Sequence, residues 1–374
     1  MKIKAAVLHE MGLDRPYAKS RPVKIEELEL DRPEEGEVLV RITAAGICHS
    51  DLSILSGVRP RPLPMALGHE GAGIVEDVGP GVDDLARGDH VVFVFMPSCG
   101  VCGPCSEGRP AICDPGLAAN VAGTLLGGGR RLHLNGDSIS HQVGVSCFAE
   151  AAVVSRRSLV KVDPELPLEQ AALFSCAVIT GVGSVVNAAR MPAGHTVAVV
   201  GLGGTGLAAL LGAKAAGATR IAGLDVLPHK LDIARDLGAD FVFDANAVDV
   251  IEQVKQATGG GVDFAFECAG EVEAMELAYG VTRRGGTTVT SGLSHPEHMM
   301  KISHVNVVVE ERTIIGSYLG SCVPQRDIPH YIELFQQGKL PVEALISSKV
   351  PLEDINEAFD NLAEGKVLRQ IITF

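Results

Sequence analysis

The chain has 374 residues and a formal net charge of −14 at pH 7. Its length favours two domains over one core, and its acidity argues against a nucleic-acid partner, because proteins that bind phosphate backbones present basic patches. No secretory signal is visible, so we expect a reducing, cytoplasmic setting for the nine cysteines, where clustered cysteines usually bind metal.

One uncharged stretch raises the question of a membrane span. Residues 196–213 run for 18 residues without a charge, which is the lower limit for crossing a bilayer. A G-x-G-G-x-G run interrupts this stretch and favours a strand, a turn and a buried helix. We therefore expect no membrane partner.

The chain opens with about 175 residues of short alternating runs and frequent turn signals. Residues 37–46 and 71–79, for example, alternate apolar and polar side chains. Such runs predict strands of a largely antiparallel β domain.

The pattern changes after about residue 177. Apolar runs typical of strands alternate with segments typical of helices, at 196–201, 205–217, 220–225, 228–238, 240–245, 248–260 and 262–270. This alternation predicts an α/β domain with a doubly wound parallel sheet. Residues 328–340 and 352–366 predict two amphipathic helices, and the residues alone leave open to which domain these belong.

A glycine-rich turn lies between the first strand and helix of this second part. Its glycines are Gly201, Gly203, Gly204 and Gly206. Glycines at this place permit a tight turn and let the backbone approach a pyrophosphate at a helix N-terminus. Asp225, at the end of the next strand, predicts a carboxylate for the ribose hydroxyls and favours NAD over NADP. The alternative is a packed turn without a ligand.

Four cysteines share one short segment, with the spacing C-x2-C-x2-C-x7-C at Cys99, Cys102, Cys105 and Cys113. Four thiolates fit a closed tetrahedral zinc site. Iron–sulfur ligation stays open, although the C-x3-C-P continuation of ferredoxins is absent. The expected compartment disfavours disulfides.

Further residues of metal-binding type are scattered along the chain. Cys48, His49, Ser50 and Asp51 are consecutive, His69 and Glu70 form a second group, and Cys176 precedes the predicted dinucleotide domain. A catalytic zinc needs three protein ligands and one open position, and two cysteines with one histidine form an established set. Taken singly, a buried cysteine is more often a core residue.

Together these motifs resemble the zinc-dependent alcohol dehydrogenases of the medium-chain dehydrogenase/reductase family. The resemblance covers essentially the whole chain and includes "GHEGAGIVEDVGPGV" (Gly68–Val82), the cysteine segment, "GLGGTG" and the terminal "GKVLRQIITF". It implies a GroES-like, mostly antiparallel β catalytic domain over residues 1–177, to which residues 321–374 return. It implies a Rossmann NAD-binding domain over residues 178–320.

The resemblance also implies roles for single residues. Cys48, His69 and Cys176 would bind a catalytic zinc, and the four clustered cysteines a structural zinc. Asp51 would hold the imidazole of His69, and Glu70 would lie behind the metal. Ser50 would take the proton of the substrate hydroxyl. Contacts with the coenzyme are implied for His49, Thr180, Lys230 and Arg369.

Several positions depart from the family pattern. His49 stands where well-studied animal members have arginine, so a weaker hold on the pyrophosphate is expected. Ser53 replaces the histidine that ends the proton relay in many members, so water or His49 would finish it. Phe95 is expected to line the pocket, and Arg59 either turns outward or favours a polar or anionic substrate.

The predicted activity is reversible hydride transfer between a primary or secondary alcohol and NAD, with two zinc ions per chain. The first alternative is a thiol-dependent formaldehyde dehydrogenase, which the absence of an arginine near Leu117 makes less favourable. The second is a non-catalytic nucleotide-binding relative, since fold alone does not fix function. A homodimer is preferred over a tetramer.

Overall fold

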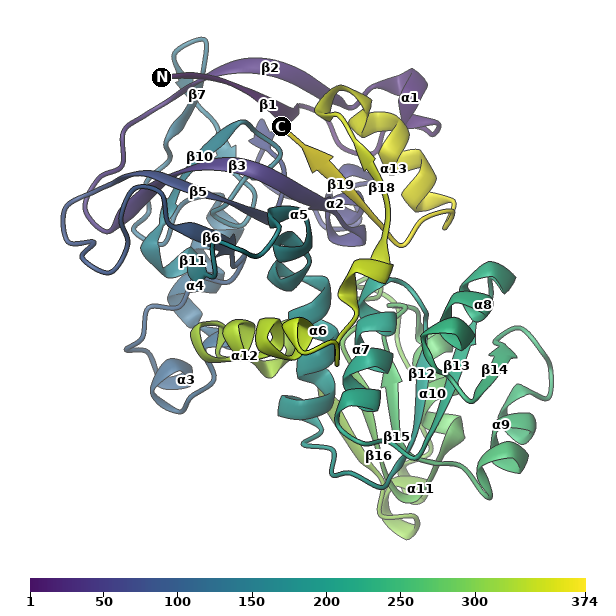
Figure 1. Cartoon of the computed structure of the whole chain (residues 1–374). Helices are drawn as coiled ribbons and strands as arrows, with labels where there is room; N and C mark the ends of the chain where they lie inside the picture. Colours follow the sequence, from purple (N-terminus) through teal and green to yellow (C-terminus); the bar gives the residue numbers. More distant parts are fainter. The chain divides into compact units, whose positions relative to one another are not determined.

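The structure is a computed structural model that describes all residues from 1 to 374 (Figure 1). It consists of two compact units. Unit 1 contains Met1–Cys176, Val323–Ile332 and Ile346–Phe374, and unit 2 contains Ala177–Cys322 and Glu333–Leu345.

Unit 1 is built on two mainly antiparallel sheets, as the sequence predicts. One sheet has the order β8-β7-β2-β1-β4-β9; the other has the order β11-β6-β5-β3-β19-β18, and β10 also pairs with β3. The strands are β1 (Lys2–Leu8), β2 (Val23–Leu30), β3 (Glu37–Ile47), β4 (Met65–Ala66), β5 (Glu70–Val78), β6 (His90–Phe93), β7 (Leu132–Leu134), β8 (Asp137–Ser138), β9 (Ser140–His141), β10 (Ala151–Ser155), β11 (Leu159–Val162), β18 (Ile346–Val350) and β19 (Arg369–Thr373).

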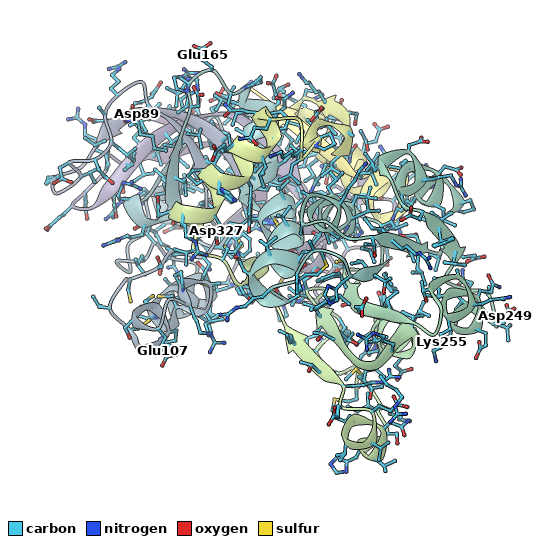
Figure 2. All side chains as sticks on the ribbon, turned by 60° about the horizontal axis from the view of Figure 1, so that its bottom comes forward. Asp89, Glu107, Glu165, Asp249, Lys255 and Asp327 are labelled. Carbon is cyan, nitrogen blue, oxygen red and sulfur yellow. The ribbon has the colours of Figure 1, made fainter.

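Strand β3 organises the second sheet of unit 1. It pairs with β5, β10 and β19, and its last four residues are all buried because neighbours cover them. The helices of unit 1 are short: α1 (Tyr17–Ser20), α2 (His49–Leu55), α3 (Gly103–Ser106), α4 (Asp114–Ala122), α5 (Leu168–Ala171) and α13 (Ile355–Ala363). Charged side chains such as Glu107 and Glu165 are exposed at its surface (Figure 2).

Unit 2 contains one parallel sheet with the order β14-β13-β12-β15-β16-β17. Its strands are β12 (Thr196–Val200), β13 (Arg220–Asp225), β14 (Phe241–Asp244), β15 (Val262–Glu267), β16 (Thr282–Thr290) and β17 (Thr313–Gly316). Its helices are α6 (Ala177–Gly183), α7 (Gly204–Ala215), α8 (Pro228–Leu237), α9 (Val250–Thr258), α10 (Val272–Val281) and α11 (His304–Val309). The predicted alternation of strands and helices is confirmed. It could be predicted because strands that are buried on both faces have continuous apolar runs.

The uncharged stretch at residues 196–213 forms β12, the glycine turn and most of α7. Nine residues of α7 are buried within the fold, which explains why the helix is apolar all round. No single helix of the chain is long and apolar enough to cross a bilayer; one pair, Leu168–Ser175 with Ala177–Ala188, passes on length and composition together but bends by 51°.

The C-terminal part of the chain divides differently from the predicted return of residues 321–374. Helix α12 (Pro324–Gln336) begins in unit 1, and Glu333–Leu345 belongs to unit 2. Leu340, Val342 and Leu345 are fully buried, and the short 3₁₀ turn Val342–Leu345 packs against α7. Burial of these three side chains therefore fixes this segment in unit 2.

Candidate active site

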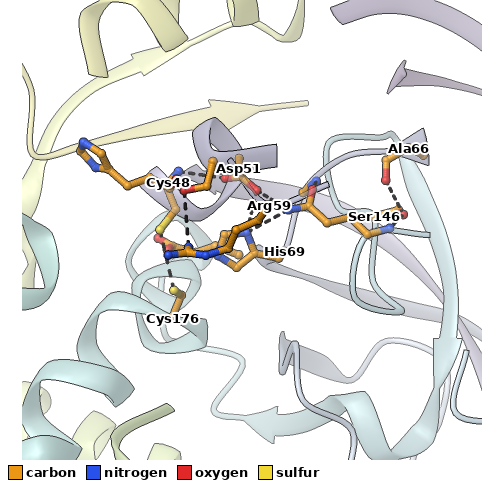
Figure 3. A network of polar contacts seen from close by, with 12 residues as sticks. Cys48, Asp51, Arg59, Ala66, His69, Ser146 and Cys176 are labelled. Atoms are coloured by element: carbon orange, nitrogen blue, oxygen red, sulfur yellow. Dashed lines mark hydrogen bonds and ion pairs between the residues drawn. The ribbon is translucent and has the colours of Figure 1, made fainter. Parts of the chain in front are cut away.

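Four buried side chains of unit 1 gather beyond the end of β3 (Figure 3). Cys48 directly follows β3, His69 directly precedes β5, and Glu70 is the first residue of β5. Cys176 is the last residue of the first segment of unit 1. One possible ligand atom from each lies within 4.8 Å of the others. The Sγ atoms of Cys48 and Cys176 are 4.0 Å apart.

The segment Cys48–Asp51 is shaped by a local signal. Cys48 is the N-cap of α2, and the Asp51 carboxylate three residues later accepts a 2.9 Å hydrogen bond from the Cys48 backbone N–H. This reciprocal arrangement is a capping box, which fixes where the helix begins. It also places Asp51, which is fully buried, beside Cys48 and His69.

The protonation of His69 follows from its partner. Nδ1 of His69 lies 2.6 Å from Oδ1 of Asp51, and a carboxylate that accepts this hydrogen leaves the lone pair on Nε2. Nε2 of His69 is buried without a hydrogen-bond partner. A bare imidazole nitrogen beside two thiols fits zinc, which accepts this donor set with one position left for a substrate.

A buried ion pair lies behind these ligands. Arg369 of β19 places Nη2 3.4 Å from Sγ of Cys48 and Nε 3.3 Å from Oε1 of Glu70. Burial raises the pKa of Glu70 to about 7, although the Arg369 charge acts in the opposite direction. Gly46 makes room for this carboxylate, because a Cβ there would lie 2.1 Å from Oε1 of Glu70.

The second cluster is formed by the four neighbouring cysteines, around α3. Their sulfur atoms lie within 4.8 Å of one another. Sγ of Cys99 accepts backbone hydrogen bonds from Val101 and Cys102, at 3.5 and 3.3 Å, and these bonds lower the pKa of Cys99 to about 6. Four sulfurs that converge this way fit the four coordination positions of zinc and leave none for a substrate.

The glycine turn of unit 2 has room for a ligand. A Cβ at Gly206 would lie 1.8 Å from the carbonyl oxygen of Gly201, so helix–strand packing requires that glycine. A Cβ at Gly203 would meet no protein atom within 4 Å. Gly203 is the N-cap of α7, where close approach of a phosphate would need a residue without a side chain.

Asp225 lies beside this turn, at the end of β13. Its Oδ2 accepts a 2.7 Å bond from the backbone of Leu202, and its Oδ1 a 3.0 Å bond from that of Leu227. Nζ of Lys230 is 4.0 Å from the same carboxylate. Gly201 and Asp225 both line a cavity of about 580 Å³ within unit 2.

The comparisons with known proteins agree with this geometry. An alcohol dehydrogenase GroES-like domain matches residues 34–164, and a zinc-binding dehydrogenase domain matches residues 204–337. The NDMA-dependent alcohol dehydrogenase of Amycolatopsis methanolica is 40% identical over 376 residues, which is 100% of this chain and 99% of the relative. The chain belongs to the zinc-dependent alcohol dehydrogenases of the medium-chain dehydrogenase/reductase family.

Other relatives are named for different substrates or a different bound coenzyme. The structure of benzyl alcohol dehydrogenase from Acinetobacter calcoaceticus has a TM-score of 0.93 and 32% identity, covering 100% of this chain and 99% of that one. The S-(hydroxymethyl)glutathione dehydrogenase of Synechocystis is 38% identical over 378 residues, covering both chains fully. A zinc-binding dehydrogenase from Sinorhizobium meliloti, bound to NADP, has a TM-score of 0.81 and 26% identity, covering both chains fully.

The remaining predicted site residues lie in different places. Ser50, half-buried, and His49, exposed, occupy the first turn of α2, and Thr180 is on α6 in unit 2. Arg369, predicted to contact the coenzyme, is 3% exposed and its guanidinium lies in the ion pair of unit 1. Its contact with the coenzyme stays a prediction, as do those of His49, Thr180 and Lys230.

The positions that depart from the family pattern also have defined surroundings. The Ser53 hydroxyl donates to the carbonyl oxygen of His49 at 2.8 Å. Nη1 of Arg59 lies 3.5 Å from that hydroxyl, so this side chain lies against α2. Phe95 meets the His69 ring edge-on, with centroids 5.5 Å apart, whereas Leu117 on α4 is 52% exposed.

One residue of the site was missed by the sequence reasoning. Gln142 is 2% exposed and donates from Nε2 to Oδ1 of Asp51 at 2.6 Å. A glutamine carries no recognisable metal-site signal, and 73 residues separate it from His69. Only the folded chain brings the two together.

Proposed function

We propose that the chain is a zinc- and NAD-dependent alcohol dehydrogenase that transfers hydride reversibly between a primary or secondary alcohol and NAD, giving the aldehyde or ketone. The observation that carries this proposal is the bare, buried Nε2 of His69 beside the thiols of Cys48 and Cys176. A structural zinc site has four protein ligands, whereas three protein ligands and an open fourth position are typical of a catalytic zinc site.

The metal would be held by Cys48, His69 and Cys176. When bound, zinc supplies a positive charge that lowers the pKa of a coordinated hydroxyl. Asp51 holds the hydrogen of His69 Nδ1 and so keeps Nε2 available. Arg369 balances the negative charge of the Cys48 thiolate from the side of Glu70.

We assign the first step in removing the proton of the alcohol to Oγ of Ser50, which lies in the first turn of α2, two residues after Cys48. The next hydroxyl along the helix, that of Ser53, already donates to the backbone of His49. We therefore propose that water or the exposed imidazole of His49 completes the path to solvent, since no imidazole stands at position 53.

NAD is proposed as the coenzyme because the cavity of unit 2 is acidic. Asp225, Glu271, Glu273 and Glu276 line it, and no lysine or arginine does. A 2′-phosphate on the ribose would meet this negative charge, whereas ribose hydroxyls can donate to Asp225. The NADP-bound relative is why both coenzymes belong in the assay.

The glutathione-linked relative favours a thiol-dependent formaldehyde dehydrogenase as the second candidate. The relative from Amycolatopsis adds NDMA as a cosubstrate to be tested. The decisive experiment measures reduced coenzyme at 340 nm over primary, secondary and aromatic alcohols, with NAD or NADP, and repeats the panel with glutathione or NDMA. We expect turnover with NAD alone; activity only with thiol and formaldehyde would favour the second candidate, and silence with all acceptors would contradict both.

We also propose that the chain forms a homodimer through α11. This helix has no buried residue, and Val305, Val308 and Val309 are 60, 62 and 55% exposed. It is followed by β17, one of the two edge strands of the parallel sheet. A copy related by a twofold axis would cover the valines and the strand edge with the same surface.

Light scattering after size-exclusion chromatography tests the dimer. Val308→Glu should shift the mass to that of a monomer, because a charge would be buried in the apolar interface. Val248→Glu is the matched control, since Val248 is fully exposed and lies outside this surface. A Val308→Glu protein that stays dimeric would exclude α11 as the interface.

A further inference from the structure

We propose that Gln142 is a positioning residue that sets the orientation of the Asp51–His69 pair and thereby the metal affinity of the buried cluster. The inference rests on metal binding at Cys48, His69 and Cys176, as proposed above, and not on the substrate. The Gln142 side chain acts through Asp51 and Gly68, and its Nε2 also lies 3.5 Å from Nδ1 of His69, the ring nitrogen on the side away from the proposed metal.

Each end of the Gln142 side-chain amide makes a short hydrogen bond. Oε1 accepts from the backbone N–H of Gly68 at 2.5 Å, and Nε2 donates to Oδ1 of Asp51 at 2.6 Å. A backbone N–H is only a donor, so the amide atom that faces Gly68 must be the oxygen. The NH₂ group therefore faces Asp51.

This orientation determines what Oδ1 of Asp51 does. It accepts two hydrogen bonds, from Gln142 Nε2 and from His69 Nδ1, both at 2.6 Å. Oδ2 accepts the third, from the backbone of Cys48. The carboxylate is thus held at both oxygens, and rotation that would release His69 must break the bond to Gln142.

The backbone around Gln142 is tied to the segment that carries His69. Gln142 N–H donates to the carbonyl of Ala66 at 3.1 Å and lies 3.0 Å from the Ser146 hydroxyl, which itself donates to Ala66 at 2.7 Å. Figure 3 shows Ser146 and Ala66 at one end of this network and Cys176 at the other.

Gly68 packs closely against the segment 142–148. Its φ is +109°, and a Cβ there would lie 2.3 Å from the backbone nitrogen of Phe148. Its carbonyl accepts from Cys147 at 3.0 Å. Because Gly68 is fixed, its hydrogen bond to Oε1 holds the Gln142 side chain in one place. Gln142 in turn restrains Asp51 and His69.

Removal of the amide would leave the buried N–H of Gly68 without its partner and Asp51 with one bond fewer. Groups that orient a metal-binding histidine typically contribute 10–100-fold to metal affinity. We expect a loss of this size at the buried cluster and none at the cysteine cluster, which has no contact with Gln142.

Two variants separate the two halves of the amide. Gln142→Glu keeps an oxygen that can accept from Gly68 but places a carboxylate next to that of Asp51. Gln142→Met removes both hydrogen bonds with a side chain of similar length. Asn356→Leu is the matched control, because that amide also makes two hydrogen bonds, to the N–H and C=O of Val23 at 3.2 and 2.9 Å, far along the chain from any metal ligand.

The measurement is competition for Zn²⁺ with a chromophoric chelator, followed by the visible spectrum of the Co²⁺-loaded full chain. Both Gln142 variants should lose about 10–100-fold in affinity at one of two sites and shift the Co²⁺ bands, whereas Asn356→Leu should change neither. If Gln142→Met does not fold, Gln142→Glu alone decides the outcome.

Two results would overturn the inference in distinguishable ways. A wild type that binds two ions, with folded variants whose affinities stay within roughly threefold of it, would overturn the role of Gln142 and leave the proposed function standing. A wild type that binds one ion, at the cysteine cluster only, would overturn the proposed function and this inference together.

Discussion

The two metal-type clusters differ in how the chain assembles them. The cysteine cluster draws all four residues from the segment 99–113, and backbone N–H groups of residues 99–116 contact its sulfurs. The buried cluster draws Cys48, His69 and Cys176 from three distant parts of the chain, and Asp51, Gln142 and Arg369 contact it. Local spacing can therefore build the proposed structural site, whereas the proposed catalytic site needs distant parts of unit 1.

The clusters also differ in what surrounds their ligand atoms. Three of the four clustered cysteines are partly exposed, whereas all residues of the buried cluster are buried. A buried, low-dielectric site strengthens every charge near it, and the bare His69 nitrogen offers a position that the four sulfurs lack. Changes to the two clusters should therefore separate catalysis from stability.

The largest expected effect is from Cys48→Ser at the buried cluster. Loss of the metal charge removes several kcal/mol of stabilisation, so turnover should fall by about 10³-fold or more, and zinc should fall from two ions per chain to one. Cys322→Ala, which changes a buried cysteine outside both clusters, is the control. Steady-state kinetics with metal analysis checks this; full activity in Cys48→Ser would refute the assignment.

The cysteine cluster should give the reverse result. Cys102→Ser should also remove one zinc ion, but it should lower the apparent Tm by roughly 5–10 °C, the effect of losing about 2–3 kcal/mol in a domain of this size. Activity per folded, metal-loaded buried site should stay near that of wild type. Calorimetry with parallel assays tests this, and a loss as large as that of Cys48→Ser would show that the two clusters are not separable.

A change in unit 2 should leave both clusters intact. Asp225→Asn removes the charge beside the glycine turn, and the preference for NAD over NADP in kcat/KM should fall by about tenfold, as expected for one hydrogen bond to a charged group. Asp244→Asn, at the end of the neighbouring strand β14, is the control. Zinc content should remain two; an unchanged coenzyme preference would argue against the role of Asp225.

The last comparison concerns acid unfolding and one buried histidine outside both clusters. Burial lowers the pKa of His141 from 6.5 to about 3, so between these values the unfolded chain binds a proton that the folded chain does not. Stability should therefore fall as pH decreases through this window, by up to about 1.4 kcal/mol per pH unit from this residue.

The variant His141→Gln tests that slope, because an amide oxygen can still accept the hydrogen bond that Nε2 of His141 receives from the backbone of Arg131. Chemical denaturation at several pH values between 4.5 and 7 should give a shallower dependence than in wild type. His133→Gln changes a more exposed histidine and serves as the control. Parallel curves for wild type and His141→Gln would contradict the buried neutral state.

The sequence predicted what depends on neighbouring residues. The strand at 196–200 and helix at 204–215 follow from apolar runs and glycine, and the cysteine cluster follows from spacing alone. The union of Cys48, His69 and Cys176 could be predicted only through the family resemblance, because nothing local relates residues so far apart.

Tertiary contacts account for the rest. Burial of Leu340 and Leu345 assigns their segment to unit 2, although its amphipathic pattern fits either domain. Gln142 joins the site through hydrogen bonds to residues 51 and 68. Such contacts between distant residues cannot be recognised in a single sequence. Arg369 likewise reaches Cys48 only because β19 pairs with β3.

The position of Arg369 has a consequence for how the protein is made. All three proposed zinc ligands have been translated by residue 176, but roughly 190 further residues must be added before Arg369, which takes about 10–40 s at usual rates of synthesis. Throughout that time β3 lacks its neighbour β19, and Cys48 lacks its guanidinium. The surroundings of Cys48 are therefore completed only once residue 369 has been added, long after the three proposed zinc ligands have been made.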